Sequence, residues 1–169
     1  WYHGIPLVGH RARKFEPQAA MAMMAELSIR NVFLPPTALK LMRQADVKNP
    51  GLNLRSIFTG GESLGGELHG WVRETFGIDA HEVFGQTECN LVVGSNSNLF
   101  PIRPGSMGKA TPGFDVRIVN DKGEELPRGQ RGIIGVRQPC PCTMIEYWKN
   151  PEATAKKYAG EFLLTGDLG

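Results

Sequence analysis

Two short polar stretches, each set among apolar residues, carry the side chains best suited to binding a nucleotide. They read VFGQTECN at 83–90 and FLLTGDLG at 162–169. Between them they supply a flat ring, a bare backbone, a hydroxyl and two carboxylates, on Phe84, Gly85, Thr87, Glu88 and Asp167. A nucleotide needs a stacking surface, donors for its phosphates, a carboxylate for its magnesium ion and an acceptor for its ribose hydroxyls. As an ordered pair, the two stretches predict a nucleotide site.

The first part of the chain alternates short apolar runs with helical patterns, which predicts an α/β fold with a parallel sheet and flanking helices. The predicted strands are Ile5–Val8, Val32–Leu34, Leu54–Phe58 and Ala80–Phe84, and the predicted helices begin at Pro17, at Pro36 and near residue 64. Ligands of such sheets bind beyond the carboxyl ends of the strands. Gly60, Gly61 and the GQTE segment at 85–88 would lie there.

The pattern changes after about residue 95, so we predict two subdomains, 1–95 and 96–169. The second begins with a linker and continues with hairpin signals typical of a small, β-rich, barrel-like unit. Its predicted strands are Asp115–Val119, Gly132–Val136 and Phe162–Leu164, with a short helix beginning at Asn150. The last of these strands would deliver Asp167.

Composition narrows the class of protein. The 169 residues are 41% hydrophobic, carry a net charge of +2 and spread their basic residues widely, which disfavours nucleic acid as a partner. No apolar run approaches the ~18 residues of a membrane span, and no signal peptide is visible. The three cysteines have no disulfide or zinc spacing, which predicts free thiols and a cytoplasmic location. The chain lacks an initial Met, and we expect it to be a piece of a longer protein.

Several motifs of the chain occur in the same order as those of the adenylate-forming superfamily, which the chain therefore resembles. Besides GQTE and TGD, they are GGESL at 60–64, PGSMGKATPGFDVRIVND at 104–121 and YWKNPEATAKKY at 147–158, the last leading to the TGD aspartate. GQTE in place of GPTE makes the chain most similar to the AMP-forming acyl-CoA synthetases. The GGESLGGE run lacks the GK[ST] ending of a Walker motif, so it does not indicate a P-loop.

The resemblance implies a reaction and its participants. A carboxylic acid attacks the α-phosphorus of ATP, magnesium pyrophosphate leaves, and the thiol of CoA then takes the acyl group from the adenylate and releases AMP. The implied ligands are therefore ATP or AMP, Mg²⁺, CoA and a small carboxylic acid, such as those of fatty acid metabolism. Self-association is left open, and the acyl group cannot be read from the sequence.

The resemblance also implies roles for individual residues. The nucleotide-binding positions are Gly60, Gly61, Glu62, Phe84, Gly85, Gln86, Thr87 and Asp167. Thr87 matches the hydroxyl that contacts the α-phosphate and Glu88 matches the magnesium ligand, which makes these two the catalytic positions. Phe84 matches the ring that stacks on adenine, and Asp167 matches the acceptor of both ribose hydroxyls. The alternatives are a core position for Phe84 at the end of its strand and a turn cap for Thr87.

Departures from the family pattern leave alternatives open. Phe84 stands in place of the usual Tyr, and Glu146 in place of the usual Gly. The 169 residues contain neither the phosphate loop ending in Lys-Gly nor the adenylation Lys, so we expect no turnover by this chain alone. Besides a synthetase that uses CoA, the sequence allows an adenylation domain that loads a carrier protein, or a non-catalytic nucleotide-binding module.

Overall fold

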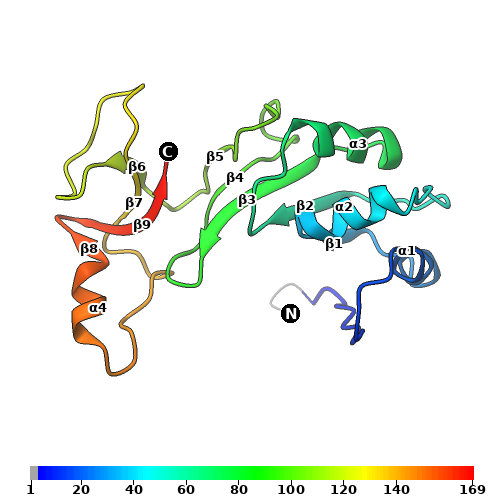
Figure 1. Cartoon of the computed structure of the whole chain (residues 1–169), viewed down its shortest axis with the longest axis horizontal. Helices are drawn as coiled ribbons and strands as arrows, with labels where there is room; N and C mark the ends of the chain where they lie inside the picture. Colours follow the sequence, from blue (N-terminus) through cyan, green and yellow to red (C-terminus); the bar gives the residue numbers. More distant parts are fainter. Residues whose placement is uncertain (1–3) are drawn as a thin grey trace.

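Residues 4–169 form two β-sheets that follow one another along an elongated molecule, as the computed structural model shows (Figure 1). The first sheet consists, in order across it, of β1 (Asn31–Phe33), β2 (Ser56–Gly60), β3 (Ala80–Gln86), β4 (Asn90–Gly94) and β5 (Lys109–Ala110). The pairs β1–β2 and β2–β3 are parallel, whereas β3–β4 and β4–β5 are antiparallel. The predicted α/β class is confirmed, with a sheet that is mixed because the chain reverses directly after β3.

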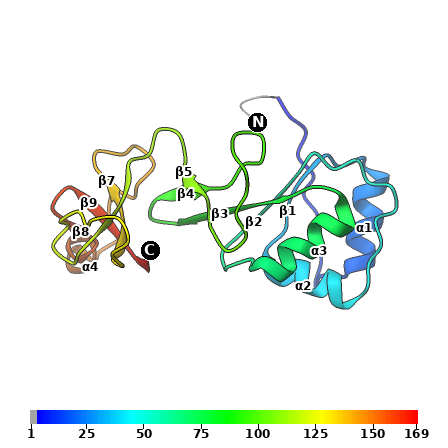
Figure 2. The same cartoon turned by 90° about the horizontal axis from the view of Figure 1, so that it is seen from above.

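Three helices cover one face of the first sheet and supply most of the core. They are α1 (Pro17–Glu26), α2 (Pro36–Gln44) and α3 (Gly66–Phe76), and Figure 2 shows them gathered at the end of the molecule remote from the second sheet. Met24, Leu39 and Val72, one from each helix, are buried together with Ile57 of β2. Burying these side chains stabilises the packing of helices on sheet, at roughly 1.5–3 kcal/mol for each large apolar side chain.

The helix ends follow local sequence signals. Pro17 and Pro36 stand at the first helical positions of α1 and α2, where the missing N–H of proline costs no hydrogen bond. Gly77 ends α3 in the left-handed conformation, with φ of 72°, which favours glycine. The predicted helices at these positions are confirmed, and α2 has the bounds that the sequence indicated.

The second sheet is antiparallel throughout. It is formed by β6 (Val116–Val119), β7 (Ile133–Arg137), β9 (Phe162–Leu168) and β8 (Tyr158–Ala159), in that order, and the short helix α4 (Pro151–Lys156) precedes β8. The side chain of Asn150 accepts a hydrogen bond from the backbone N–H of Ala153 at 3.0 Å and so caps α4. The predicted strands and helix are found, and β9 continues through Asp167.

A tight hairpin of the first sheet, formed by β3 and β4, packs against the second sheet. Strand β3 ends at Gln86, and β4 begins only four residues later, at Asn90. The residue after Glu88, Cys89, is fully buried in a cluster with Val92 from β4 and with Val136 and Leu163 from the second sheet. The tip of the β3–β4 hairpin is thus packed onto the second sheet, and Figure 1 shows it reaching toward β9 and the segment before α4.

One predicted strand is wrong. Residues 5–8 have no regular secondary structure, and Ile5, Leu7 and Val8 are 52%, 69% and 48% exposed. An apolar run becomes a strand only where a neighbouring strand accepts its hydrogen bonds, and none of the described strands pairs with this one.

Two further findings concern whole-chain properties. Within residues 4–169, no helix has the length and apolar character to cross a membrane. Cys89, Cys140 and Cys142 are all free thiols. The subdomain boundary near residue 95 stays a prediction.

Candidate active site

The catalytic carboxylate predicted at the hairpin, Glu88, is held in place by the second half of the chain. Its side-chain oxygen Oε1 accepts a hydrogen bond from the hydroxyl of Tyr147, 59 residues later. Its backbone carbonyl accepts one from the N–H of Met144 at 2.7 Å. Thr87, the other predicted catalytic residue, is exposed beside it in the turn. Because both anchors lie on the segment before α4, the carboxylate is fixed although its turn lies at the surface.

The same contacts keep Glu88 ionised. The Tyr147 hydroxyl lowers the pKa of the Glu88 carboxyl most, and its own backbone N–H lowers it further. Burial raises the pKa, and the positive charge of Lys157, the smallest of the four effects, lowers it. A carboxylate has about four lone-pair directions, so the bond from Tyr147 leaves room for a cation. Ionised carboxylate oxygens are the ligands that Mg²⁺ prefers, and the residue therefore fits the role of a single protein ligand to magnesium.

Gln86 and Asp167, which the sequence placed in two separate motifs, are in direct contact. The Gln86 side-chain Nε2 donates to Oδ2 of Asp167 at 2.6 Å, across 81 residues of chain, and to the backbone carbonyl of Thr165 at 3.0 Å. Asp167 is exposed near the end of β9, and its backbone N–H donates to the hydroxyl of Thr165 at 3.1 Å. The structure thus brings together the GQTE and TGD motifs at the junction of the two sheets.

Glu62 has a set of partners that the sequence did not predict. Its Oε1 accepts from the backbone N–H of Thr37 at 3.1 Å and also from the Thr37 hydroxyl, while its Oε2 pairs with Nζ of Lys40 at 3.1 Å. The Thr37 hydroxyl and then Lys40 hold the pKa of the Glu62 carboxyl below its ordinary value. Glu62 therefore accepts a hydrogen bond from a backbone N–H that has no partner within the first turn of α2, and it fixes the loop after β2 against that helix.

The glycines at the ends of β2 and β3 allow close approach of neighbouring chain segments. A Cβ on Gly60 would lie 2.6 Å from the carbonyl oxygen of Val83, and one on Gly85 would lie 1.9 Å from the carbonyl oxygen of Asn90. Gly61 has a φ of +92° and open space around it. Phe84 is half-buried and packs against the apolar cluster that contains Cys89 and Val92. Its stacking on adenine stays a prediction.

Three groups result from these contacts: Glu62 at the end of β2, Gln86 with Asp167 between the sheets, and Glu88 with Tyr147 at the hairpin turn. Because β2 and β3 are parallel neighbours, their carboxyl ends lie at the same edge of the first sheet. Among residues 4–169, no group of three or more His, Cys, Asp or Glu side chains could hold a metal ion by itself.

Sequence reasoning missed several residues of this edge. Glu82 is 8% exposed and accepts from the backbone N–H of Leu64 at 3.3 Å, so it supports the loop that carries Glu62. A charged residue in the middle of an apolar strand was the available signal for it. Tyr147 and Lys157 lay inside a recognised motif, but their partners are distant in sequence and no spacing indicated them.

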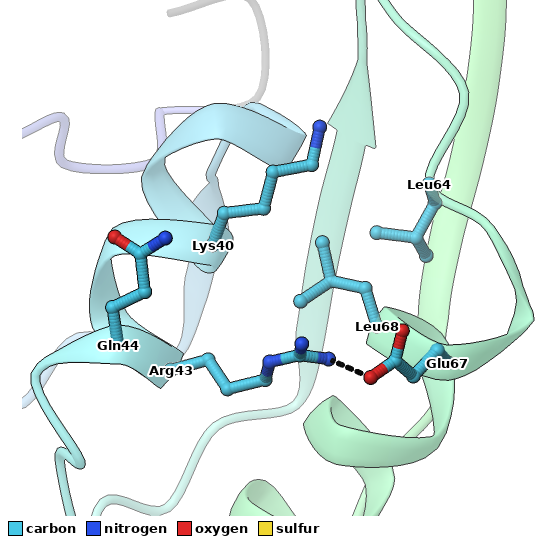
Figure 3. A pocket seen from close by; sticks show the side chains of 6 residues that line it. All are labelled: Lys40, Arg43, Gln44, Leu64, Glu67 and Leu68. Carbon is cyan, nitrogen blue, oxygen red and sulfur yellow. Dashed lines mark ion pairs between the residues drawn. The ribbon is translucent and has the colours of Figure 1, made fainter.

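A surface pocket of about 290 Å³ lies between α2 and α3, away from these groups (Figure 3). Arg43 of α2 crosses it to form an ion pair with Glu67 of α3 at 2.9 Å, and Leu64 and Leu68 supply its apolar wall. Lys40, which lines the pocket, also pairs with Glu62 of the predicted site. The predicted nucleotide-binding residues do not line it.

A family model described as AMP-binding enzyme matches residues 1–148. The chain belongs to this family. The matched residues include the GGESL and GQTE segments. The human protein named acyl-coenzyme A synthetase ACSM4, mitochondrial, is 34% identical over 173 aligned residues, which cover 100% of this chain and 30% of that protein. A Bacillus subtilis protein named uncharacterized acyl-CoA ligase YtcI is 34% identical over 98% of this chain and 30% of its own length.

Solved structures of AMP-binding enzymes have the same fold. ATP-bound MatB from Rhodopseudomonas palustris superposes with a TM-score of 0.82 at 29% identity, covering 92% of this chain and 31% of MatB. An acyl-CoA synthetase from Brucella canis gives a TM-score of 0.80 at 27% identity, covering 92% of this chain and 29% of that one. The fold is therefore that of part of an adenylate-forming acyl-CoA synthetase, and the chain spans about 30% of the length of these relatives.

Proposed function

We propose that the full-length protein is an AMP-forming acyl-CoA synthetase. An oxygen of the substrate carboxylate forms a bond to the α-phosphorus of ATP, and the bond to the bridging oxygen breaks so that pyrophosphate leaves. The thiolate of CoA then attacks the acyl carbon, and AMP leaves as the acyl-CoA forms. The observation that carries the proposal is the contact of Gln86 with Asp167, because it unites the two nucleotide motifs. The names of the relatives support the same reaction.

In this proposal the chain's own residues mainly position the nucleotide and neutralise charge. The exposed hydroxyl of Thr87 donates to the α-phosphate, on which negative charge accumulates during attack. Glu88, whose pKa the Tyr147 hydroxyl lowers, would hold a magnesium ion, and the ion would supply positive charge to neutralise the pyrophosphate.

The remaining residues bind the nucleoside. Asp167 accepts from the ribose hydroxyls, and Gln86 holds one of its carboxylate oxygens. Phe84 stacks on the adenine, for which only a π-face is needed, and Gly60, Gly61 and Glu62 border the base. The pairing of Glu62 with Thr37 and Lys40 supports this by fixing the loop after β2.

The decisive experiment uses the full-length protein with ATP, magnesium chloride, CoA and a panel of fatty and aromatic acids, with products identified by mass spectrometry. We expect acyl-CoA, AMP and pyrophosphate in equal amounts with at least one acid. An adenylation domain that loads a carrier protein would release pyrophosphate without forming acyl-CoA. A nucleotide-binding module would bind ATP and release no pyrophosphate with any acid, which would refute catalysis.

We also propose that the 169-residue chain is inactive by itself, since it contains no phosphate loop ending in Lys-Gly. Pyrophosphate release by the isolated chain should stay at background under the conditions in which the full-length protein turns over. Robust turnover would contradict this.

Use of Mg²⁺, a place in fatty acid metabolism and a cytoplasmic location belong to the same proposal. The three free thiols support a reducing compartment, whereas several relatives carry the word mitochondrial in their names. Imaging of the tagged full-length protein in its own cells would separate the two locations. Omitting magnesium from the assay should abolish pyrophosphate release.

A further inference from the structure

Lys157 is a half-buried cation at the junction of the two sheets. It is the residue that ends α4, and its Nζ donates to the side-chain oxygen Oε1 of Gln86 at 3.3 Å and to the backbone carbonyl of Thr165 at 3.1 Å. Gln86 is itself a member of the Gln86–Asp167 pair, and the Thr165 carbonyl accepts a hydrogen bond from the Gln86 amide as well. Its neighbour Lys156 differs, because that side chain is 74% exposed and pairs with Glu152 on the outer surface of α4.

The chemistry of these partners determines how the Gln86 amide is oriented. An ammonium group can only donate, whereas a backbone carbonyl and an ionised carboxylate can only accept. Gln86 must therefore turn its oxygen toward Lys157 and its NH₂ group toward Thr165 and Asp167. With the ammonium removed, the amide oxygen would lose its donor, and the Gln86 side chain would be held by its NH₂ group alone.

The charge of Lys157 also acts beyond Gln86. It is one of the groups that lower the pKa of the Glu88 carboxyl. The backbone of the same residue is fixed as well, since its carbonyl accepts from the N–H of Leu164 in β9 at 2.7 Å. Lys157 is thus attached at both its backbone and its side chain to the strand that carries Asp167.

We propose that Lys157 is a positioning residue for the ribose site: by fixing the Gln86 amide, it presents the carboxylate of Asp167 to the ribose hydroxyls. The inference rests on the proposed nucleotide site and adds to it a residue that acts through Gln86 and Asp167 without touching the nucleotide. It implies that the contribution of Lys157 depends on the ribose hydroxyls being present.

The test compares the affinities of the full-length protein for AMP and for 2′,3′-dideoxy-AMP, measured by calorimetry. The affinity for AMP divided by the affinity for 2′,3′-dideoxy-AMP reports the contribution of the ribose hydroxyls. Effects on phosphate or base binding cancel in this ratio. Lys157→Met keeps the apolar stem and removes the donor, and we expect it to lower the ratio about tenfold, the effect of one hydrogen bond to a charged group. Lys156→Met is the matched control and should leave the ratio unchanged.

A second pair of variants separates positioning from general damage. In the Gln86→Leu background, Lys157→Met should have no further effect on the ratio, because the connecting amide is already absent. Equal losses of affinity for both nucleotides in Lys157→Met would overturn the inference, since they would indicate a direct phosphate contact or a loosened fold. If Lys157→Met fails to fold, Lys157→Gln provides the same comparison.

The wild-type protein tests the underlying site separately. If it binds AMP no better than 2′,3′-dideoxy-AMP, Asp167 does not bind the ribose, and the proposed site falls together with this inference. If it prefers AMP and Lys157→Met retains the preference, only the role of Lys157 is refuted.

Discussion

Glu88 and Asp167 are both carboxylates near strand ends, but their partners in the structure differ in kind. Glu88 accepts from the hydroxyl of Tyr147, whereas Asp167 accepts from the amide of Gln86. The first arrangement leaves an ionised group beside an exposed hydroxyl, that of Thr87. The second leaves an acceptor beside an amide at the junction of the sheets. The two carboxylates should therefore affect different steps of the proposed reaction.

Glu88→Gln should slow adenylation in the full-length protein. The substitution keeps size and hydrogen bonding but removes the charge that neutralises the departing pyrophosphate, at a cost of about 2–4 kcal/mol in the activation free energy. Thiolysis of a preformed acyl-adenylate should suffer less, because no pyrophosphate remains. Single-turnover kinetics of each half-reaction measure this. Equal impairment of both would remove Glu88 from the role we propose.

Asp167→Ala should weaken the binding of AMP as well as ATP, because the ribose is present in both nucleotides. Loss of hydrogen bonds to a charged acceptor should cost about 1.5–3 kcal/mol of binding free energy. Calorimetric titration with AMP measures it, with circular dichroism to show that the exposed substitution leaves the fold intact. Unchanged affinity for AMP would contradict the ribose assignment.

Tyr147→Phe should raise the pKa of the Glu88 carboxyl toward its ordinary value, because the hydroxyl is the largest cause of its lowering. A carboxyl with a lowered folded-state pKa stabilises the fold above its unfolded-state pKa, and this stabilisation is lost as pH falls through the folded-state pKa. The variant should therefore lose most stability, relative to wild type, at neutral pH, and the difference should shrink in acid. Urea unfolding at a series of pH values tests this, and a difference that grows toward low pH would contradict it.

Among the structural elements, the β3–β4 hairpin matters most to the site. Its sharp turn positions Glu88 and buries Cys89 against the second sheet. The sequence indicated a strand running into a polar loop, but it did not predict β4, the antiparallel strand that follows the turn. The requirement for glycine at position 85 is likewise apparent only from the structure, in which an added Cβ would lie 1.9 Å from the carbonyl oxygen of Asn90.

Gly85→Ala should destabilise the fold by about 3 kcal/mol, since the added Cβ meets backbone that cannot move without opening the hairpin. Gly70→Ala is the control: Gly70 lies inside α3 with no atom within 4 Å of an added Cβ, so alanine should stabilise that helix by about 1 kcal/mol. Chemical denaturation of both variants measures the two changes. Similar stability of Gly85→Ala and wild type would show that the hairpin is not held as described.

Elements with strong local signals could be predicted, and those that depend on distant partners could not. Pro36 and the apolar spacing that follows it specify α2 without reference to the rest of the fold. The run Ile5–Val8 has equally suitable residues for a strand, but it finds no strand to pair with in the part of the chain that the structure describes. Local pattern does not contain that information.

At the scale of the whole molecule, the candidate site lies where the two sheets meet. The motifs themselves could be recognised from sequence, because they are short and ordered. The contacts that assemble them could not, since Gln86 and Asp167 are 81 residues apart and Glu88 and Tyr147 are 59 apart. Packing of Cys89 against Val136 and Leu163 holds the sheets in the arrangement that makes these contacts.

The central claim, that this junction activates a carboxylate with ATP, is tested most directly by exchange of labelled pyrophosphate into ATP. The full-length protein should catalyse this exchange only when a carboxylic acid substrate is present and without any CoA, because adenylation is reversible and precedes thiol attack. Glu88→Gln should slow the exchange, because it raises the activation free energy of adenylation by about 2–4 kcal/mol. Absence of exchange with every acid in the panel, or exchange that continues without any acid, would contradict the claim.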